Sequence, residues 1–337
     1  MRKNYTLTLI EGDGIGPEVV RATTEVIAAA GVNINWERAL IGQAAQAEFG
    51  TLLPAATLDA IRRNKVALKG PITTPIGEGY ASLNVAIRKS LELYSCVRPI
   101  KNFAGVKSLH QNVDLVIIRE NTEDLYSGLE HEVVPGVVQS LKIITRAAST
   151  RIAQFAFDLA MRDKRKKVTA IHKANIMKLS DGLFLECCRG VARNYPGIQY
   201  EEMIVDNTCL QMVINPQQFQ VVLTENLYGD ILSDLGAGLV GGIGVVPGAN
   251  IGRECAVFEP VHGSWPSAAG KGIANPMACM LTGVMMLRHL GENDPGVRIE
   301  SAIERTLKAG KATPKDLGGI ASTVEFTKEV VRNLQAA

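Results

Sequence analysis

Asp230 and Asp234 lie four residues apart, and of all residues in this sequence their types and spacing point most directly to chemistry. In a helix this spacing places both carboxylates on one face, where like charges repel unless a cation lies between them. The neighbouring Ile231, Leu232 and Leu235 predict a partly buried helix, in which an unpaired carboxylate is costly. A hard divalent cation such as Mg²⁺ or Mn²⁺ prefers these oxygen ligands. The alternatives are a solvated pair or a charge cluster that complements the helix dipole.

A second candidate is the glycine-rich segment at residues 11–18, which follows a strand-like stretch and opens a helical one. In a dinucleotide-binding fingerprint such glycines let a pyrophosphate approach the backbone closely. The match is poor, because Gly12, Gly14 and Gly16 give GxGxG and Pro17 follows directly. No acidic residue ends a strand about 20 positions later, as that fingerprint requires. The segment therefore predicts a tight strand-to-helix turn rather than a Rossmann site.

The elements that must position these residues alternate between strand-like apolar runs and helical patterns, which predicts an α/β fold. Strands are expected at residues 5–10, 66–68, 115–118, 168–171 and 220–223, and helices at residues 18–30, 148–162 and 277–290. The glycine-rich stretch at residues 236–252 is the candidate for a crossing between two domains.

Composition sets broad limits on the class of protein. The 337 residues suffice for two domains or one large α/β unit. With 46% hydrophobic residues, 21% charged residues and a net charge of +2, no nucleic-acid or membrane partner is expected. The six cysteines show no CxxC spacing, which predicts reduced thiols. Because we recognise no signal peptide and no apolar run of membrane-spanning length, we expect a soluble, cytoplasmic protein.

Six segments carry a resemblance to a known family, namely residues 9–18, 119–126, 172–177, 226–234, 241–250 and 259–264. Together they resemble the signature sequences of the isocitrate/isopropylmalate dehydrogenase family. Its members are decarboxylating β-hydroxyacid dehydrogenases that act on isocitrate, 3-isopropylmalate, homoisocitrate or tartrate. The resemblance implies a two-domain α/β fold with a large mixed sheet, not a Rossmann fold, assembled as a homodimer. It implies a large cofactor-binding domain at residues 1–97 plus 247–337, and a small domain at residues 98–246 with the dimer interface.

The segment before Arg88 indicates the substrate within this family. It contains Ser82 and Asn84, and this Ser-x-Asn arrangement resembles isocitrate dehydrogenases. The isopropylmalate enzymes instead place acidic and leucine side chains there. Hydroxyl and amide groups suit a third carboxylate, whereas an alkyl group needs apolar contact. Helix capping is the alternative role for both residues.

We therefore expect oxidative decarboxylation of isocitrate. The alternatives are homoisocitrate dehydrogenase, 3-isopropylmalate dehydrogenase, or a non-catalytic regulatory subunit of the same fold. Such a subunit would be expected to lack the metal or base residues, which this chain retains.

Isocitrate is a tricarboxylate, so its site needs several cations, and guanidinium forks bind carboxylates bidentately. The resemblance implies that the substrate contacts are Arg88, Arg98, Arg119 and Asn175. Taken singly, each arginine is more often part of a surface ion pair. Arg119 differs from the others because it follows the apolar residues 115–118, at the strand end where ligands of α/β proteins bind.

The implied reaction oxidises a secondary alcohol, releases the β-carboxylate as CO₂ and protonates the resulting enol. The resemblance implies Lys173 as the base for the hydroxyl proton and Tyr126 as the acid that protonates the enol. It implies Asp206, Asp230 and Asp234 as ligands of Mg²⁺ or Mn²⁺, with Lys173 and Asp206 acting in the partner subunit's site. Without the resemblance, Lys173 would be a surface lysine and Tyr126 a core tyrosine.

Two further segments resemble the family's contacts to a nicotinamide cofactor. The implied residues are Thr73 and Thr74 on the nicotinamide side, and His262, Gly263, Ser264, Ser267, Ala268 and Asn275 in the adenosine loop. NADP-dependent relatives carry lysine and tyrosine at the positions of Ser267 and Ala268, and NAD-dependent relatives usually carry aspartate there. Ser267 can bond a ribose hydroxyl but adds no charge to repel a 2′-phosphate. We expect NAD as the cofactor, with weak discrimination against NADP.

Overall fold

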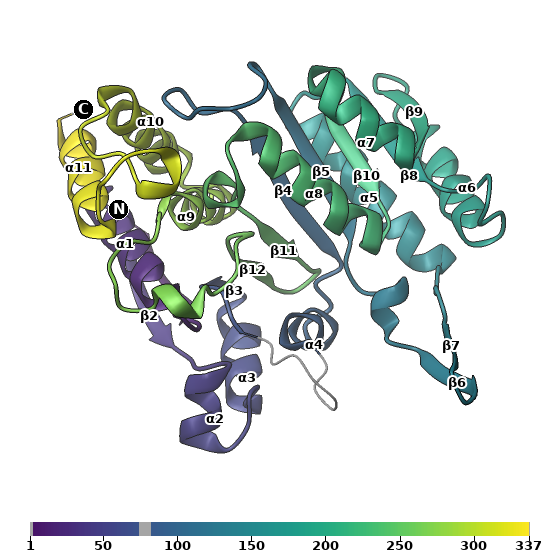
Figure 1. Cartoon of the computed structure of the whole chain (residues 1–337), viewed down its shortest axis with the longest axis horizontal. Helices are drawn as coiled ribbons and strands as arrows, with labels where there is room; N and C mark the ends of the chain where they lie inside the picture. Colours follow the sequence, from purple (N-terminus) through teal and green to yellow (C-terminus); the bar gives the residue numbers. More distant parts are fainter. Residues whose placement is uncertain (1–2, 74–81, 337) are drawn as a thin grey trace.

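A ten-stranded mixed sheet runs through the computed structural model, which describes residues 3–73 and 82–336 (Figure 1). From one edge to the other the strands are β2 (Asn33–Arg38), β1 (Asn4–Ile10), β3 (Val66–Lys69), β12 (Ala256–Phe258), β11 (Ala249–Ile251), β4 (Ser95–Lys101), β5 (Asp114–Glu120), β10 (Val221–Thr224), β8 (Lys167–His172) and β9 (Gln199–Ile204). The antiparallel pairs β12–β11, β11–β4 and β4–β5 lie in the middle of the sheet. The flanking strands pair in parallel, so the expected large mixed sheet of an α/β protein is confirmed.

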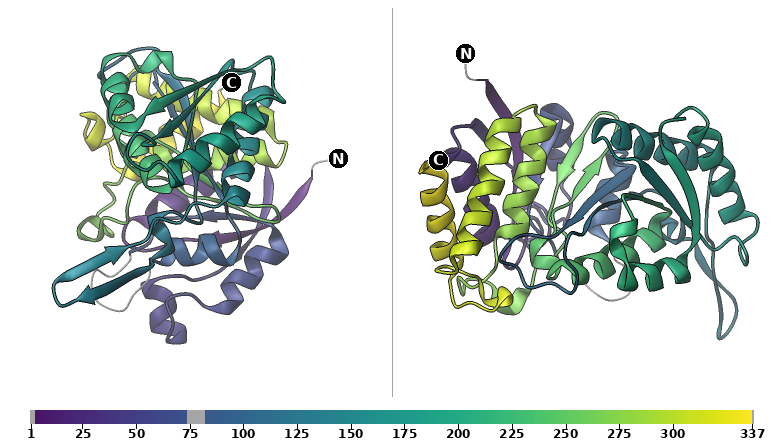
Figure 2. Two further views of the ribbon diagram at one scale, coloured as in Figure 1. Left: turned by 90° about the vertical axis from the view of Figure 1, so that its right-hand side faces the viewer. Right: turned by 90° about the horizontal axis from the view of Figure 1, so that it is seen from above.

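The helices pack in groups beside the sheet (Figures 1 and 2). One group comprises α1 (Gly16–Ala29), α9 (Met277–His289), α10 (Asn293–Ala309) and α11 (Thr323–Gln335). Two further pairs are α5 (Arg146–Arg162) with α6 (Ser180–Ala192) and α7 (Val205–Ile214) with α8 (Asn226–Val240). The shorter helices are α2 (Gln43–Phe49), α3 (Ala55–Asn64) and α4 (Leu83–Ser90), with 3₁₀ turns η1 (Leu125–Ser127), η2 (Pro216–Gln218), η3 (Ile243–Val245), η4 (Pro266–Ala268) and η5 (Lys315–Leu317). Among the described residues, no helix is both long enough and apolar enough to span a membrane.

The long predicted elements are present, with ends that differ by at most two residues from those expected. The sequence pattern missed β11 and β12 because three residues are too few to display a period of two. It also missed the hairpin of β6 (Glu130–Val134) and β7 (Val137–Ser140), whose strands are exposed along their whole length and lack a buried face. The proposed domain division stays a prediction, and its boundary at residues 97 and 98 falls inside β4.

The glycine-rich turn between β1 and α1 is tight, as its sequence predicted. Gly12 and Gly14 both have positive φ, at 77° and 60°. A Cβ on Gly12 would lie 2.1 Å from the carbonyl oxygen of Pro71, and one on Gly14 would lie 2.0 Å from that of Ser264. Side chains at these positions would push apart the two loops that the turn contacts. The turn thus serves close packing of those loops.

Candidate active site

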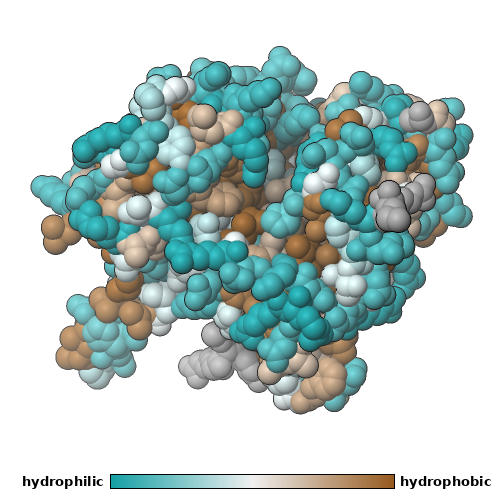
Figure 3. Space-filling view, turned by 180° about the vertical axis from the view of Figure 1, so that it is seen from behind, coloured by the Kyte–Doolittle hydropathy of each residue, from teal (hydrophilic) through white to brown (hydrophobic). Residues whose placement is uncertain are grey.

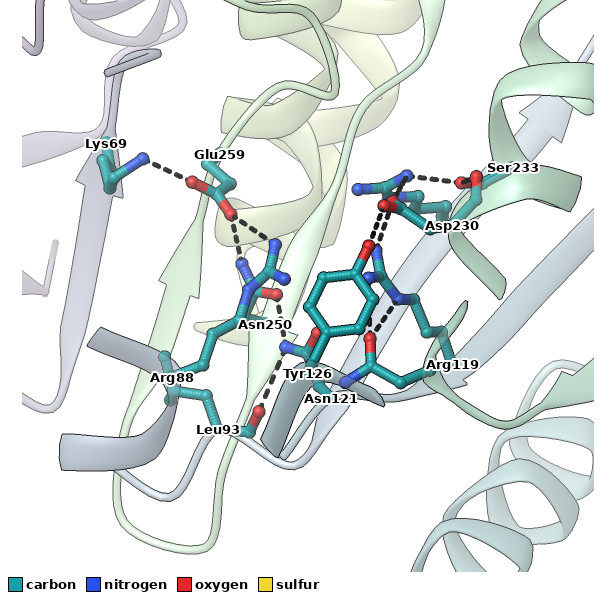
Figure 4. Close-up of polar contacts among 12 residues, drawn as sticks. Lys69, Arg88, Leu93, Arg119, Asn121, Tyr126, Asp230, Ser233, Asn250 and Glu259 are labelled. Atoms are coloured by element: carbon teal, nitrogen blue, oxygen red, sulfur yellow. Dashed lines mark hydrogen bonds and ion pairs between the residues drawn. The ribbon is translucent and has the colours of Figure 1, made fainter. Parts of the chain in front are cut away.

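The site is built around Asp230, which lies in the second turn of α8 (Figure 4). Its Oδ1 accepts a hydrogen bond from Arg119 Nη1 at 2.5 Å, and its Oδ2 accepts one from the Tyr126 hydroxyl at 2.5 Å. Arg98 Nη1 lies 3.5 Å from Asp230 and 3.7 Å from Asp234. The two aspartates predicted to share a helix face therefore do so, with an arginine between them.

Arg119 at the end of β5 is only 1% exposed and needs a fixed set of partners. Asn226 supplies one, since its Oδ1 accepts from Nε at 2.9 Å and from Nη2 at 2.6 Å. The guanidinium also lies 5.0 Å from the ring centroid of Tyr126. Gly229 lets the helix approach, because a Cβ there would lie 2.6 Å from Cγ of Arg119. The local sequence of α8 thus fixes one of the predicted substrate arginines.

Charges around this cluster set the protonation states of its members. Burial opposes ionisation of Asp230, but the Arg119 guanidinium, the Tyr126 hydrogen bond and the nearby Arg98 together outweigh it, so the pKa of Asp230 lies below its usual range. Burial raises the pKa of Asp234 despite the nearby Arg98. Burial, together with the hydrogen bond to Asp230, raises the pKa of Tyr126. Tyr126 therefore holds its proton at neutral pH, as a group that donates a proton must.

A cavity of about 110 Å³ adjoins this cluster. Its lining includes Asn84, Arg88, Arg98 and His262. Among the described residues, Asn84 Oδ1, Arg88 Nε and His262 Nε2 are buried without a hydrogen-bond partner. Buried polar atoms are normally bonded, so these atoms mark where the polar groups of a ligand fit. Residues expected to touch the substrate and residues expected to touch the cofactor therefore share one cavity.

The sequence reasoning missed a buried ionic network on the other wall of this cavity (Figure 4). Lys69 Nζ lies 2.5 Å from Glu259 Oε2, and Asn250 Nδ2 donates to Glu259 Oε1 at 2.6 Å. Arg88 Nη2 is 3.6 Å from the same carboxylate. Burial disfavours the charged form of Glu259, but Lys69 and Arg88 outweigh it and lower its pKa to about 2. Lysine at the end of a fully buried strand was the sequence signal that could have revealed it.

Two segments expected to hold the cofactor meet in the structure. The hydroxyls of Thr73 and Ser264 lie 2.7 Å apart. The Asp13 side chain in the tight turn accepts a hydrogen bond from the main-chain N–H of Thr73 at 2.8 Å. The main-chain carbonyl oxygen of Ser264 accepts one from the N–H of Ile15 at 2.9 Å. Thr74 lies outside the described residues. The turn at residues 11–18 thus fixes the predicted cofactor loops without itself being a Rossmann fingerprint.

The rest of the adenosine loop is divided between surface and core. His262 is buried, which lowers its pKa and favours the neutral imidazole, and its Nδ1 lies 3.1 Å from the Gly263 carbonyl oxygen. Ser267 is exposed, whereas the methyl group of Ala268 is 1% exposed and packs in the main core. A ligand can therefore contact the Ser267 side chain but not that of Ala268. Asn275 donates to Asp316 Oδ2 at 3.1 Å.

Lys173 and Asp206 form an ion pair, in the turn after β8 and in the first turn of α7. Asp206 is not part of the Asp230 cluster, and the described residues contain no group of three metal-ligating side chains. Asn175 is exposed in the same turn as Lys173. Ser82 stands at the N-cap of α4, but its side chain makes no capping hydrogen bond, so the capping alternative gains no support. One chain therefore gathers only part of the predicted site.

Apolar side chains are exposed on the elements around this second group. The exposed residues comprise Ile176, Leu179, Leu210, Val213 and Ile214 near the Lys173–Asp206 pair, and Val133, Val134, Val137 and Val138 in the β6–β7 hairpin. The hairpin projects from the body of the molecule, and its tip is partly hydrophobic on the surface (Figures 2 and 3). Large exposed apolar side chains gathered in this way are typical of a protein–protein interface.

Comparisons with known proteins agree with this geometry. A family profile described as isocitrate/isopropylmalate dehydrogenase matches residues 6–330. Isocitrate dehydrogenase (NAD) catalytic subunit 5, mitochondrial, of Arabidopsis thaliana is 53% identical over 98% of this chain and 88% of its own length. A mitochondrial protein of Dictyostelium discoideum, named as a regulatory subunit of isocitrate dehydrogenase (NAD), is 49% identical over 98% and 92%. A crystal structure of isocitrate dehydrogenase from Methylococcus capsulatus superposes with a TM-score of 0.95, at 48% identity, over 98% and 99% of the two chains.

These comparisons correct one expectation. The curated relatives are named as mitochondrial proteins, so the cytoplasmic location expected from the sequence is wrong. Composition and hydropathy do not distinguish between two aqueous compartments, which is why they misled. The relatives' names also distinguish catalytic from regulatory subunits, and this gives no support to the expected homodimer.

Proposed function

Because the chain belongs to the isocitrate/isopropylmalate dehydrogenase family, we propose that it catalyses the oxidative decarboxylation of isocitrate to 2-oxoglutarate and CO₂. The hydride acceptor is NAD, and a divalent cation, Mg²⁺ or Mn²⁺, is required. The observation that carries this proposal is the convergence of Arg98, Arg119 and the protonated Tyr126 on the Asp230 carboxylate, beside a cavity. Cations, an acid and a carboxylate pair are what this reaction needs at one place.

Substrate recognition rests on the cations that surround the cavity. Arg88, Arg98 and Arg119 are each at least 91% buried, so their charges are poorly screened by water and attract the carboxylates of a tricarboxylic acid strongly. Asn84 lines the same cavity, and its side-chain NH₂ group can donate to the third carboxylate. An isopropyl group would leave these polar groups without hydrogen-bond partners. Such a loss discriminates against 3-isopropylmalate more strongly than a difference of one methylene would.

The carboxylates fit a hard divalent cation. Asp230 is held ionised by Arg119, and Asp234 lies one turn further along the same face. Together with Asp206 of a partner subunit they would supply the oxygen ligands that Mg²⁺ or Mn²⁺ prefers. When bound, the cation withdraws charge from the hydroxyl oxygen and stabilises the enolate, while NAD accepts the hydride.

The protein's own groups then move two protons. Lys173 of the partner subunit takes the hydroxyl proton as the C–H bond gives up its hydride, which leaves a carbonyl. The bond to the β-carboxylate breaks, CO₂ departs, and the bonding electron pair remains in the enolate. Tyr126 donates its phenolic proton to the carbon that lost CO₂. The raised pKa of Tyr126 keeps the acid protonated until that step.

A shared site requires a second subunit of this fold, and the exposed apolar residues around Lys173 and along the β6–β7 hairpin support one. The partner is either a copy of this chain or a distinct subunit of the kind that the relatives' names describe. Mixing a Lys173→Ala variant with a Tyr126→Phe variant tests the sharing. Hybrid sites should recover activity that both variants lack alone. No recovery after verified subunit exchange would show that each site is complete within one chain.

The regulatory-subunit alternative rests on the 49% identity with a protein of that name. Against it, the chain retains Tyr126, Lys173 and all three aspartates, and the structure places Tyr126 on Asp230 within hydrogen-bond distance. Homoisocitrate differs from isocitrate by one methylene, which is worth only about 1–3 kcal/mol in a pocket. Side activity on it is compatible with this proposal, whereas a preference for it is not.

The deciding assay compares isocitrate, homoisocitrate and 3-isopropylmalate as substrates, each with NAD or NADP and Mn²⁺. We expect the highest kcat/KM with isocitrate and NAD. A higher value with either other acid would replace the proposed substrate, and a higher value with NADP would replace the proposed cofactor. Absence of turnover by the chain alone, with restoration by a catalytic subunit, would favour the regulatory role.

A further inference from the structure

A second buried ionic cluster lies away from the cavity, between α6 and α8. It consists of Lys142, Asp181 and Glu225, whose side chains are 12%, 0% and 1% exposed. Lys142 Nζ lies 2.5 Å from Asp181 Oδ1 and 2.5 Å from Glu225 Oε2. The three residues come from separate segments: after strand β7, in the first turn of α6, and immediately before α8. The mechanism proposed above makes no use of them.

Burying such charges is expensive, and apolar residues of similar size often stabilise a fold as well or better. The two carboxylates raise the pKa of Lys142, against the effect of burial, so the lysine is charged. Burial raises the pKa of Glu225 to about 8, and its Oε1 has no hydrogen-bond partner among the described residues. A cluster this costly calls for a role other than stability.

Asp181 contacts functional elements through its carboxylate, whereas Glu225 is joined to α8 through its main chain. Asp181 Oδ2 accepts the main-chain N–H of Lys173 at 2.7 Å and the hydroxyl of Tyr228, in the first turn of α8, at 3.2 Å. The carbonyl oxygen of Glu225 accepts the N–H of Gly229 at 3.1 Å, in the first turn of the same helix. The Lys142 ammonium also lies 4.7 Å from the ring centroid of Tyr228. Lys142 thus ties the turn that carries Lys173 to the start of the helix that carries Asp230.

We infer that Lys142 is a positioning residue, which acts through Asp181 and Glu225 to hold the Lys173 turn and the N-terminus of α8 in a fixed relation. This inference rests on the proposed function for its catalytic consequence. Because Lys173 serves the partner's site and Asp230 serves this subunit's own, the cluster links two active sites through one chain. A displacement of about 1 Å at a reacting group can cost about 100-fold in rate, so the link matters for turnover.

The test compares Lys142→Met with the isosteric Asp181→Asn and with the matched control Lys166→Met, which removes an exposed lysine that makes no described side-chain bond. We expect both cluster variants to lower kcat about 10- to 100-fold, as loss of a supporting contact typically does. KM for isocitrate should change less than about threefold, because the substrate arginines are untouched. The control should match the wild type in both constants.

A second readout does not depend on turnover. Hydrogen–deuterium exchange resolved to the Lys173 amide should accelerate about tenfold or more in both cluster variants, because Asp181 no longer holds that N–H firmly. If Lys142→Met fails to fold, Asp181→Asn gives both readings. Unchanged exchange at Lys173, or a kcat within about twofold of wild type in a folded variant, would overturn the inference. Failure of the wild type to turn over isocitrate would refute the proposed function instead. Hydrogen–deuterium exchange at the Lys173 amide would then still test whether Lys142 positions the Lys173 turn.

Discussion

Replacing Glu259 by glutamine should destabilise the protein by an amount that depends on pH. The Glu259 carboxylate is the shared partner of Lys69, which is 1% exposed, and of Arg88. Its pKa falls from 4.5 to about 2 in the folded protein. At about 1.4 kcal/mol per pKa unit, this shift corresponds to about 3 kcal/mol of stability at pH 7. Breaking a buried pair from one side costs a similar amount, about 3–5 kcal/mol.

The sign of the pH dependence follows from the direction of the shift. A carboxyl whose pKa is lowered by folding stabilises the protein above its unfolded value of 4.5, and loses that effect as pH falls toward 2. The difference in free energy of unfolding between wild type and Glu259→Gln should therefore be constant from pH 7 to pH 6. It should narrow to about 2 kcal/mol at pH 3.5.

Urea unfolding followed by circular dichroism, at one fixed protein concentration, measures this gap. The matched control is Glu254→Gln, which removes a surface ion pair to Lys65 with both side chains more than half exposed. It should cost less than about 1 kcal/mol. A Glu259→Gln penalty below about 1 kcal/mol at pH 7, or a gap that does not narrow in acid, would refute the reasoning.

Three other predictions concern the reaction. Tyr126→Phe should lower kcat by about 10²- to 10⁴-fold with little change in KM for isocitrate, measured by steady-state kinetics, and a loss below about threefold would remove Tyr126 as the acid. Ser267→Asp should raise the ratio of kcat/KM for NAD over NADP about tenfold or more through repulsion of the 2′-phosphate, and an unchanged ratio would place that phosphate elsewhere. Mn²⁺ should bind more tightly when isocitrate is present, because substrate carboxylates can replace Asp230 as the partner of Arg119. Electron paramagnetic resonance measures the Mn²⁺ affinity, and equal affinities with and without isocitrate would contradict this coupling.

The sequence predicted the fold well where an element is long and buried on a recognisable period. Strands β5, β8 and β10 and helices α5 and α9 were of this kind. The β6–β7 hairpin could not be predicted in this way, because all residues of both strands are exposed and none packs in the chain's own core. Local patterns could not establish where β4 and β11 lie either, since their pairing depends on contacts about 150 residues apart.

The candidate site divides in the same way. Residues inside signature segments, such as Arg119, Tyr126 and Asp230, could be proposed from the sequence, and the structure brings them together. The pairs Lys69–Glu259 and Lys142–Asp181 could not, because each joins residues that are far apart in the chain, 190 positions in the first case. The apolar strand around Lys69 indicates that this lysine is buried, but a single sequence does not show which carboxylate pairs with it.

Under the proposed mechanism, the contacts of Asp230 account for a need for both the substrate and a partner subunit. Both of its oxygens are engaged, one by Arg119 and one by Tyr126, so a cation must compete with a guanidinium whose other hydrogen-bond partner among the described residues is Asn226. A tricarboxylate changes that balance, because its carboxylates satisfy the buried arginines and release Asp230 to bind metal. In the proposed shared site Asp206 comes from the partner subunit, so the third oxygen ligand would depend on assembly. If the shared site is correct, binding of metal, substrate and partner subunit should therefore be coupled through the Asp230 carboxylate.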